Sequence, residues 1–240
     1  MSTSQSEIGF IRRLVLKHVR EAFVNQDAIE REWRGLNFTA PPDWSRAIDQ
    51  YDRFVELVST TGALIEFLPA AAGTGMDSIY VRDASIMTDR GAVLCRMGKP
   101  QRDGEPAAQE AAFRAAGVAV LGAIDAPGRL EGGDVVWLNA RTLAVGQGYR
   151  SNADGIRQLR DRLGDQVDEV ITVPLPHWRG PSDAAIARTM RAFSSSRTSS
   201  VPISKSSSSL WCIGGAPAMC FISCRSSAPS IPIWRWSILR

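Results

Sequence analysis

The sequence predicts an α/β fold made of repeated units, and three observations support that prediction. Two segments, 77–96 and 129–150, each contain an acidic residue, a short strand, a polar turn, an apolar strand and a final arginine. Their acidic residues Asp83 and Asp134 lie 51 positions apart, and a helical apolar pattern followed by a short strand precedes each segment. A composition of 44% hydrophobic and 22% charged residues is that of an ordinary folded protein. Repeats of this length are typical of stacked or ring-arranged modules.

The region before the first acidic segment is expected to contain a strand, helices and a second strand. Residues 14–19 are the candidate first strand, and residues 21–33 have mixed helical character. The Pro-Pro-Asp sequence at 41–43 is typical of the start of a helix, and apolar residues recur at helical spacing over 47–58. A strand over 63–68 then follows.

In the first acidic segment, alternating residues predict a strand between Asp77 and Asp83. Side chains two positions apart lie on the same face of a strand, so both carboxylates would point the same way. A polar turn at 88–91 leads into an apolar strand that ends at Arg96. The alternative is that the two acidic groups are simply solvated at the ends of a strand.

The second acidic segment is expected to be a Gly-Gly turn that leads into a hairpin around residues 139–141. Glu131 directly precedes the two glycines, which allow the backbone to come close to a ligand. The helices and strands expected on either side cover residues 107–116, 118–121, 153–163 and 170–173. Gly117 and Gly164 are expected to end the two helices. The alternative is a surface hairpin whose acidic groups are solvated.

Five short motifs together resemble one known family. They are MDSIYVRD, LCRMGKP, RLEGGDVVWL, GQGYRSN and VPLPHWRGPSD, and they occur in the order and spacing of the dimethylarginine dimethylaminohydrolase branch of the guanidine-modifying pentein superfamily. The resemblance covers roughly residues 8–183. It implies a ring of ββαβ modules that hold the substrate guanidinium in a central channel. About three of the family's five modules are recognisable, so residues 1–183 are expected to form an incomplete pentein-like guanidine-binding domain.

The resemblance also implies roles for five side chains. Asp77 and Asp83 are expected to bind the guanidinium and the α-amino end of the substrate, and Arg96 and Arg150 its α-carboxylate. Glu131 is the candidate catalytic residue, because a carboxylate held there can accept guanidinium N–H groups and stabilise positive charge.

Two further positions bear on substrate and access. Arg82 stands where many relatives have a glutamate, which leaves the finer substrate preference open. The resemblance places a mobile loop over the substrate at residues 23–25, and an ordinary turn is the alternative.

The family reaction releases citrulline and an amine from (methylated) arginine. A cysteine thiolate attacks the guanidinium carbon, a histidine serves as general acid and base, and no metal or organic cofactor is required. The family histidine would fall three residues after Asp183, where this chain has Ile186, and the nucleophile would lie beyond Arg240. Cys95 is expected to be a small buried hydrophobe, and His177 a loop histidine. We therefore expect a truncated and inactive chain, with both the catalytic histidine and the catalytic cysteine missing.

The composition changes after residue 183. Residues 184–240 contain no Asp or Glu, seven Lys or Arg and many serines. We expect this segment to be an aberrant, disordered tail produced by a change of reading frame or genomic context. Binding of nucleic acid or of an acidic membrane surface by the tail is a weaker alternative, because seven charges over this length form no dense patch.

The whole chain is expected to act on a small molecule. The chain has no run of 18 apolar residues and charged residues interrupt its first apolar segment, so a cytoplasmic protein without a membrane or nucleic-acid partner is expected. The ligand class is arginine or a methylarginine. A non-catalytic arginine-binding or structural module and arginine deiminase-type or amidinotransferase-type chemistry are the alternatives. Assembly into a homo-oligomer is left open.

Overall fold

The computed structural model describes residues 3–175. The chain divides into two units, Met1–Phe193 and Ser194–Arg240, and all described residues belong to the first. The predictions for residues 184–240, for His177 and for Ile186 therefore lie outside the described residues.

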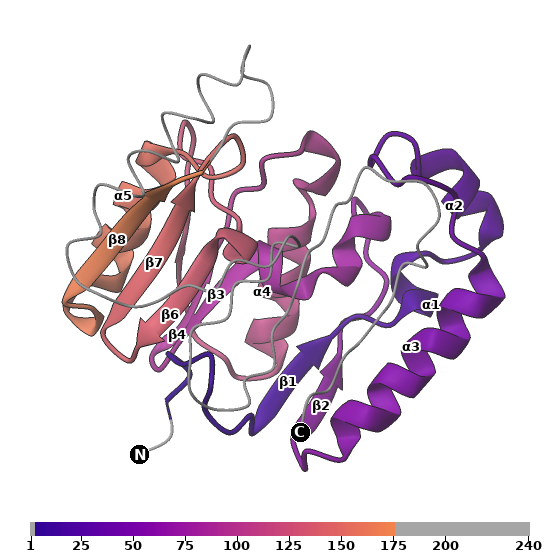
Figure 1. The fold of residues 1–240 in the computed structure, drawn as a ribbon, viewed down its shortest axis with the longest axis horizontal. Helices are drawn as coiled ribbons and strands as arrows, with labels where there is room; N and C mark the ends of the chain where they lie inside the picture. Colours follow the sequence, from indigo (N-terminus) through magenta and orange to yellow (C-terminus); the bar gives the residue numbers. More distant parts are fainter. Residues whose placement is uncertain (1–2, 176–240) are drawn as a thin grey trace, which may run out of the picture. The chain divides into compact units, whose positions relative to one another are not determined.

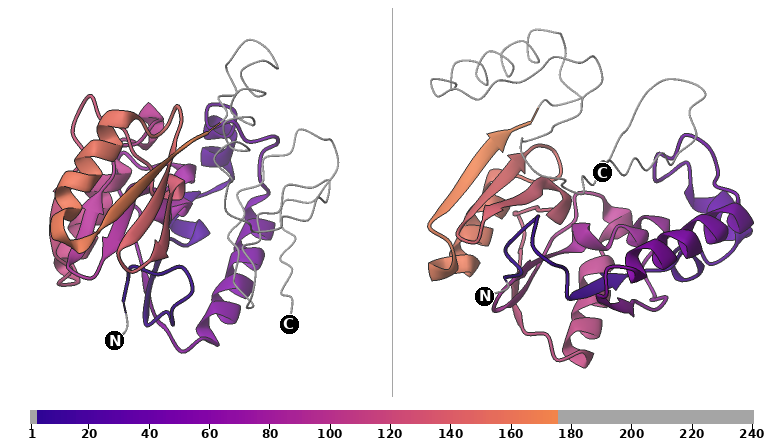
Figure 2. Two further views of the ribbon diagram at one scale, coloured as in Figure 1. Left: turned by 60° about the vertical axis from the view of Figure 1, so that its left-hand side comes forward. Right: turned by 60° about the horizontal axis from the view of Figure 1, so that its bottom comes forward.

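The described residues form three small sheets, each associated with helices (Figure 1). The first module is a parallel pair of strands, β1 (Arg13–Leu16) and β2 (Leu64–Phe67), joined by three helices. These helices are α1 (Val19–Ala22), α2 (Gln26–Glu32) and α3 (Trp44–Ser59). Figures 1 and 2 show α3 alongside the β1–β2 pair. The Asp43 carboxylate caps α3 by accepting a hydrogen bond from the Arg46 amide at 2.7 Å, so the predicted helix start is confirmed.

The second and third modules have the same topology. In each, an antiparallel hairpin is followed by a helix and by a strand that pairs in parallel with the second strand of the hairpin. The second module contains β3 (Ser85–Thr88), β4 (Gly91–Leu94), α4 (Glu105–Ala115) and β5 (Val120–Ala123). The third contains β6 (Val135–Asn139), β7 (Thr142–Gln147), α5 (Ala153–Leu163) and β8 (Glu169–Pro174). The predicted ββαβ architecture is confirmed for the second and third modules, whereas the described first module has a parallel strand pair without a hairpin.

Short 3-10 turns fill the connections that lead into and out of the hairpins. They are η1 (Met76–Ile79), η2 (Val81–Ala84), η3 (Pro100–Arg102), η4 (Gly132–Asp134) and η5 (Gly164–Gln166). Gly117 lies just after α4 and Gly164 caps the end of α5, with positive φ values of 71° and 52°. A residue with an L side chain adopts such φ values only at a cost in free energy.

The predicted strand between Asp77 and Asp83 is wrong. The Ser78 amide donates to the Gly75 carbonyl and the Asp83 amide to the Tyr80 carbonyl, each at 3.0 Å, so the segment is wound into η1 and η2. Extended backbone begins only at Ser85. The alternating residues suggested a strand, but each of the two 3-10 turns buries some of its own side chains. The two carboxylates therefore do not lie on one strand face.

Strand boundaries differ from the sequence prediction in the first module. The candidate strand over 14–19 ends at Leu16, because His18 caps α1 by accepting a hydrogen bond from the Arg20 amide at 3.1 Å. Residues 23–25 form the short connection between α1 and α2, with Phe23 buried and Val24 at a φ of 64°.

One apolar core joins the second and third modules. Its buried members come from both hairpins and from α5, and they include Ile86, Val93, Cys95, Leu130, Trp137, Leu143, Val145 and Leu159. A second cluster, with Val19, Phe23, Ile29 and Met76, packs α1, α2 and η1. Among the described helices, none is long and apolar enough to cross a membrane.

Candidate functional site

The acidic turns of the second and third modules lie against each other. η2 and η4 are in contact, and a Cβ on Gly132 would collide with the Arg82 carbonyl oxygen. A Cβ on Gly133 would come within 2.5 Å of the Asp83 carboxylate. Gly132 is therefore required by the packing of one turn on the other, whereas a side chain at Gly133 would meet only the movable end of the Asp83 side chain.

Arg102, at the end of η3, connects the acidic groups of the second module. Its guanidinium forms a bidentate pair with Glu105, with both distances 2.8 Å, and donates to the Asp83 carboxylate at 2.8 Å and to the Asp77 carbonyl at 3.2 Å. The side chain is only 3% exposed. Burial disfavours its charge, but the hydrogen bonds and charges of Glu105 and Asp83 outweigh burial and raise the pKa of Arg102. Arg102 thus stays charged between the carboxylates of Asp83 and Glu105.

Glu131 is buried beside this network. Its Oε1 accepts a hydrogen bond from the Gly98 amide at 3.0 Å. Its Oε2 lies 3.0 Å from the Arg150 guanidinium and 3.9 Å from that of Arg102, yet neither contact has the alignment of a hydrogen bond. Burial raises the pKa of Glu131, although both arginines and the Gly98 amide oppose that rise. Oε2 is thus a buried acceptor that can still receive a hydrogen bond.

Asp134 has a neutral partner. The Ser151 hydroxyl donates to the Asp134 carboxylate at 2.6 Å and accepts a hydrogen bond from the Glu131 amide at 3.1 Å. Arg150 lies 3.9 Å from the same carboxylate. Burial raises the pKa of Asp134, and the Ser151 hydrogen bond opposes the rise.

Asp77 lies in η1 and is 4% exposed. The Lys99 ammonium donates to Asp77 Oδ2 at 2.8 Å and to the Leu36 carbonyl at 3.1 Å. Lys99 therefore connects η1, at the start of the first acidic segment, to the loop that follows α2 in the first module.

The structure gathers most of the predicted site residues. Asp83 and Glu131 meet around Arg102, Arg150 pairs with Glu131, and Asp77 joins the group through its carbonyl. Arg96 differs, because its side chain donates to the Gly128 carbonyl at 3.4 Å and has no ion pair with a described carboxylate.

Sequence reasoning missed four residues of this cluster: Lys99, Arg102, Glu105 and Ser151. Arg102 and Glu105 stand three positions apart across the start of α4, a spacing that allows an ion pair. That spacing is common on helix surfaces, so it could not have identified a buried network by itself.

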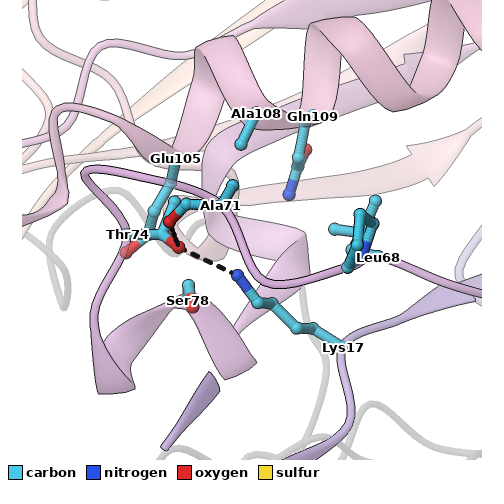
Figure 3. A pocket seen from close by; sticks show the side chains of 9 residues that line it. Lys17, Leu68, Ala71, Thr74, Ser78, Glu105, Ala108 and Gln109 are labelled. Atoms are coloured by element: carbon cyan, nitrogen blue, oxygen red, sulfur yellow. Dashed lines mark hydrogen bonds between the residues drawn. The ribbon is translucent and has the colours of Figure 1, made fainter. Parts of the chain in front are cut away.

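Two cavities adjoin the cluster. The larger, of about 360 Å³, is lined by Asp77 and Glu105 together with residues of α2 and of the loop before η1. The smaller, of about 30 Å³, surrounds the Lys17 ammonium, which donates to the Thr74 hydroxyl at 3.0 Å (Figure 3). Burial lowers the pKa of Lys17.

The described cysteine and histidine lie in settings that do not suit nucleophilic catalysis. Cys95 is buried, and burial together with the charges of Asp83, Glu131 and Asp134 raises the pKa of its thiol. The His18 ring faces the Asp52 carboxylate at 2.8 Å in the first module. Among the described residues, no group of three or more His, Cys, Asp or Glu is arranged to hold a metal ion.

Comparison with known proteins finds similarity to guanidine-modifying enzymes. Residues 76–181 match the family model described as arginine deiminase. Over 134 residues the chain is 34% identical to the N(G),N(G)-dimethylarginine dimethylaminohydrolase of Streptomyces coelicolor, an alignment that covers 55% of this chain and 50% of the relative. Over 118 residues it is 30% identical to the enzyme of the same name from Pseudomonas aeruginosa, covering 49% and 46%. The chain thus spans about half the length of the curated relatives it matches.

Solved structures show the same fold. Dimethylarginine dimethylaminohydrolase from Pseudomonas aeruginosa in complex with citrulline superposes with a TM-score of 0.55 at 24% identity, covering 69% of this chain and 62% of that one. The N-terminal domain of ArgZ, a cyanobacterial arginine dihydrolase bound to its product, gives a TM-score of 0.55 at 22% identity, covering 69% and 58%. The resemblance seen in the sequence motifs and the pentein fold are thereby confirmed for the matched part of the chain.

Proposed function

We propose that the described domain binds a guanidino compound, arginine or a methylated arginine, through Asp77, Asp83 and Glu131. The observation that carries this proposal is the buried Oε2 of Glu131, an acceptor without a hydrogen bond beside carboxylates that already hold guanidinium groups. A site that pairs with the chain's own arginines has the charge and the planar acceptors that a guanidinium ligand requires.

The proposed lineage chemistry is hydrolysis of a guanidinium C–N bond to give citrulline and an amine. In that reaction Glu131 would accept N–H groups of the guanidinium and stabilise its positive charge while a thiolate attacks the central carbon. The names of the matched relatives, dimethylarginine dimethylaminohydrolase and arginine dihydrolase, support this class of reaction.

A second candidate, binding without turnover, is favoured by the environment of Cys95. A buried thiol whose pKa is raised by nearby carboxylates stays protonated and is a poor nucleophile. His18, engaged with Asp52, lies in the first module. We therefore propose that residues 3–175 hold the ligand and do not themselves supply the thiolate or the acid–base group.

The test measures binding and turnover separately on the full 240-residue chain. Calorimetry with arginine and with dimethylarginine is expected to show binding, and Glu131→Gln is expected to weaken it about tenfold or more, the loss of roughly one charge-assisted hydrogen bond. Glu110→Gln, which removes a charge paired with Arg114 on α4, should leave binding unchanged.

Citrulline release measured on the same samples decides between the two candidates. No release from folded, ligand-binding protein supports binding without turnover. Release from protein freed of contaminating deiminases would overturn binding without turnover, and loss of that release in a Cys95→Ala variant would show that residues 3–175 do supply the thiolate. Absence of binding by wild-type protein with an intact circular dichroism spectrum would overturn guanidine binding itself.

A further inference from the structure

Residues 3–7 form an N-terminal arm that precedes the sequence motifs and lies against the second and third modules (Figure 1). Gln5 of this arm is only 3% exposed, although its side chain is polar. Its Nε2 donates to the Ala140 carbonyl at 2.6 Å and to the Gln166 carbonyl at 3.3 Å, and its Oε1 accepts a hydrogen bond from the Asp89 amide at 3.2 Å. The arm is therefore anchored to the turns of both hairpins.

Farther along the arm, Glu7 forms an ion pair with Arg82 of η2. Arg82 Nη2 donates to Glu7 Oε1 at 2.7 Å and to the Val135 carbonyl at 2.8 Å. The same Glu7 oxygen accepts a hydrogen bond from the Trp137 amide at 3.1 Å. The two charged side chains thus hold each other while both bind the backbone of β6.

β6 is an edge strand, because the strand order of its sheet is β6–β7–β8. Among residues 3–175 it pairs with no strand other than β7. The peptide groups of alternate residues face the same side of a strand, so the Val135 carbonyl and the Trp137 amide belong to one row of groups at the edge. A strand added at this edge would bond to the same carbonyl and amide, which Glu7 and Arg82 already occupy.

The residues of β6 suit pairing with a second copy of the chain. Val136 and Leu138 are 43% and 47% exposed, and β6 (Val135–Asn139) contains no charged residue. An edge strand offers alternating donors and acceptors, so two copies of β6 related by a two-fold axis complement each other without repulsion between like charges. An uncovered β6 would therefore favour association of two chains.

We propose that the Glu7–Arg82 pair caps the edge of β6 and keeps the chain from pairing with a second copy of itself through this strand. Arg82, whose part in substrate preference the sequence leaves open, then belongs to the cap. The proposal concerns assembly and does not depend on the proposed function.

The experiment measures the mass of the full chain by analytical ultracentrifugation at increasing protein concentration. Wild type is expected to remain a monomer, whereas Glu7→Ala should form dimers, a rise in mass of roughly twofold. Arg90→Ala is the matched control, because it breaks an exposed ion pair with Asp165 that joins two turns. Its mass should equal that of wild type.

Two further measurements connect the association to β6. Adding Val136→Lys to Glu7→Ala places a charge on the exposed side of the strand, and the double variant should return to a monomer. Hydrogen exchange of the Trp137 amide, measured where Glu7→Ala is still monomeric, should be roughly tenfold faster than in wild type, because one charge-assisted hydrogen bond is lost.

Three results would overturn the proposal. Equal masses for wild type and Glu7→Ala at every concentration would show that the cap does not control assembly. Dimers that persist after Val136→Lys is added would place the association on another surface. Unchanged exchange of the Trp137 amide in Glu7→Ala would show that Glu7 does not protect the edge of β6.

Discussion

The second and third modules hold equivalent acidic residues in different ways. Asp83 in η2 pairs with the buried guanidinium of Arg102, whereas Asp134 in η4 accepts a hydrogen bond from the Ser151 hydroxyl. Both partners lie between the second strand of a hairpin and the helix that follows it. The shared topology thus determines which loop supplies the partner of the acidic residue, but it does not determine whether that partner is a cation or a hydroxyl.

The number of carboxylates explains the difference. Arg102 is surrounded by Asp83 and Glu105, with Glu131 at 3.9 Å, and buried like charges at such distances require a cation. Ser151 has only the Asp134 carboxylate to satisfy, and a hydroxyl suffices. The second module therefore depends on charge balance and the third on hydrogen-bond satisfaction, a contrast that mutations can test.

The largest expected effect is that of Arg102→Met. Removal of the guanidinium leaves buried carboxylates uncompensated, so the free energy of unfolding should fall by about 3–5 kcal/mol in denaturant titrations. Arg114→Met, which breaks an exposed pair with Glu110, should cost about 0.5 kcal/mol. Adding Glu105→Gln to Arg102→Met should recover part of the loss. Equal costs for the two arginine variants would contradict a charge-based role for Arg102.

Gly132→Ala should have the next largest effect, because it tests the contact between the two acidic turns. The new Cβ would meet the Arg82 carbonyl, a backbone atom that cannot rotate away, and the expected cost is about 2–3 kcal/mol. Gly148→Ala in the same module is the control, since its Cβ would meet no atom nearer than 3.8 Å. Thermal unfolding of both variants measures the difference, and matching melting temperatures would argue against tight packing of η2 on η4.

Ser151→Ala should cost less, about 1–2 kcal/mol, because it removes one neutral donor and leaves the Glu131 amide and the Asp134 carboxylate without that partner. Measurements at different salt concentrations distinguish a neutral hydrogen bond from an electrostatic contact in the third module. The loss in Ser151→Ala should be nearly independent of ionic strength, and its free energy of unfolding can be measured at low and high salt. A loss that shrinks markedly in high salt would indicate that Arg150 already holds Asp134 electrostatically.

The smallest expected effect is on the pH dependence of stability. Burial raises the folded-state pKa of Glu131 above the ordinary glutamate value of 4.5, so the folded state binds more protons than the unfolded state just above that pH. The contribution of Glu131 to stability is therefore fully present below about pH 4.5 and is lost as the pH rises through the folded pKa. Glu131→Gln should flatten this part of the curve of unfolding free energy against pH. An unchanged slope would show that Glu131 is ionised throughout.

The sequence predicted the modules better than it predicted the local path of the site. Gly117, Gly164 and the helix over 153–163 were placed correctly, because backbone conformation at a glycine and an apolar helical face are encoded within a few residues. The strand expected between Asp77 and Asp83 was wrong. A 3-10 turn and a short strand share the same residue types, and contacts with other modules decide between them.

The sequence by itself determined the repeat, the hairpin turns and the carboxylates that gather at the module ends. Only the tertiary structure decided which cation meets which carboxylate. Arg102 pairs with Asp83, which lies 19 positions away in the sequence. Glu131 accepts a hydrogen bond from the Gly98 amide, which lies 33 positions away. Sequence patterns over a few residues do not predict such pairs. An ion pair forms wherever packing brings two side chains within a few ångströms, whatever their separation along the chain.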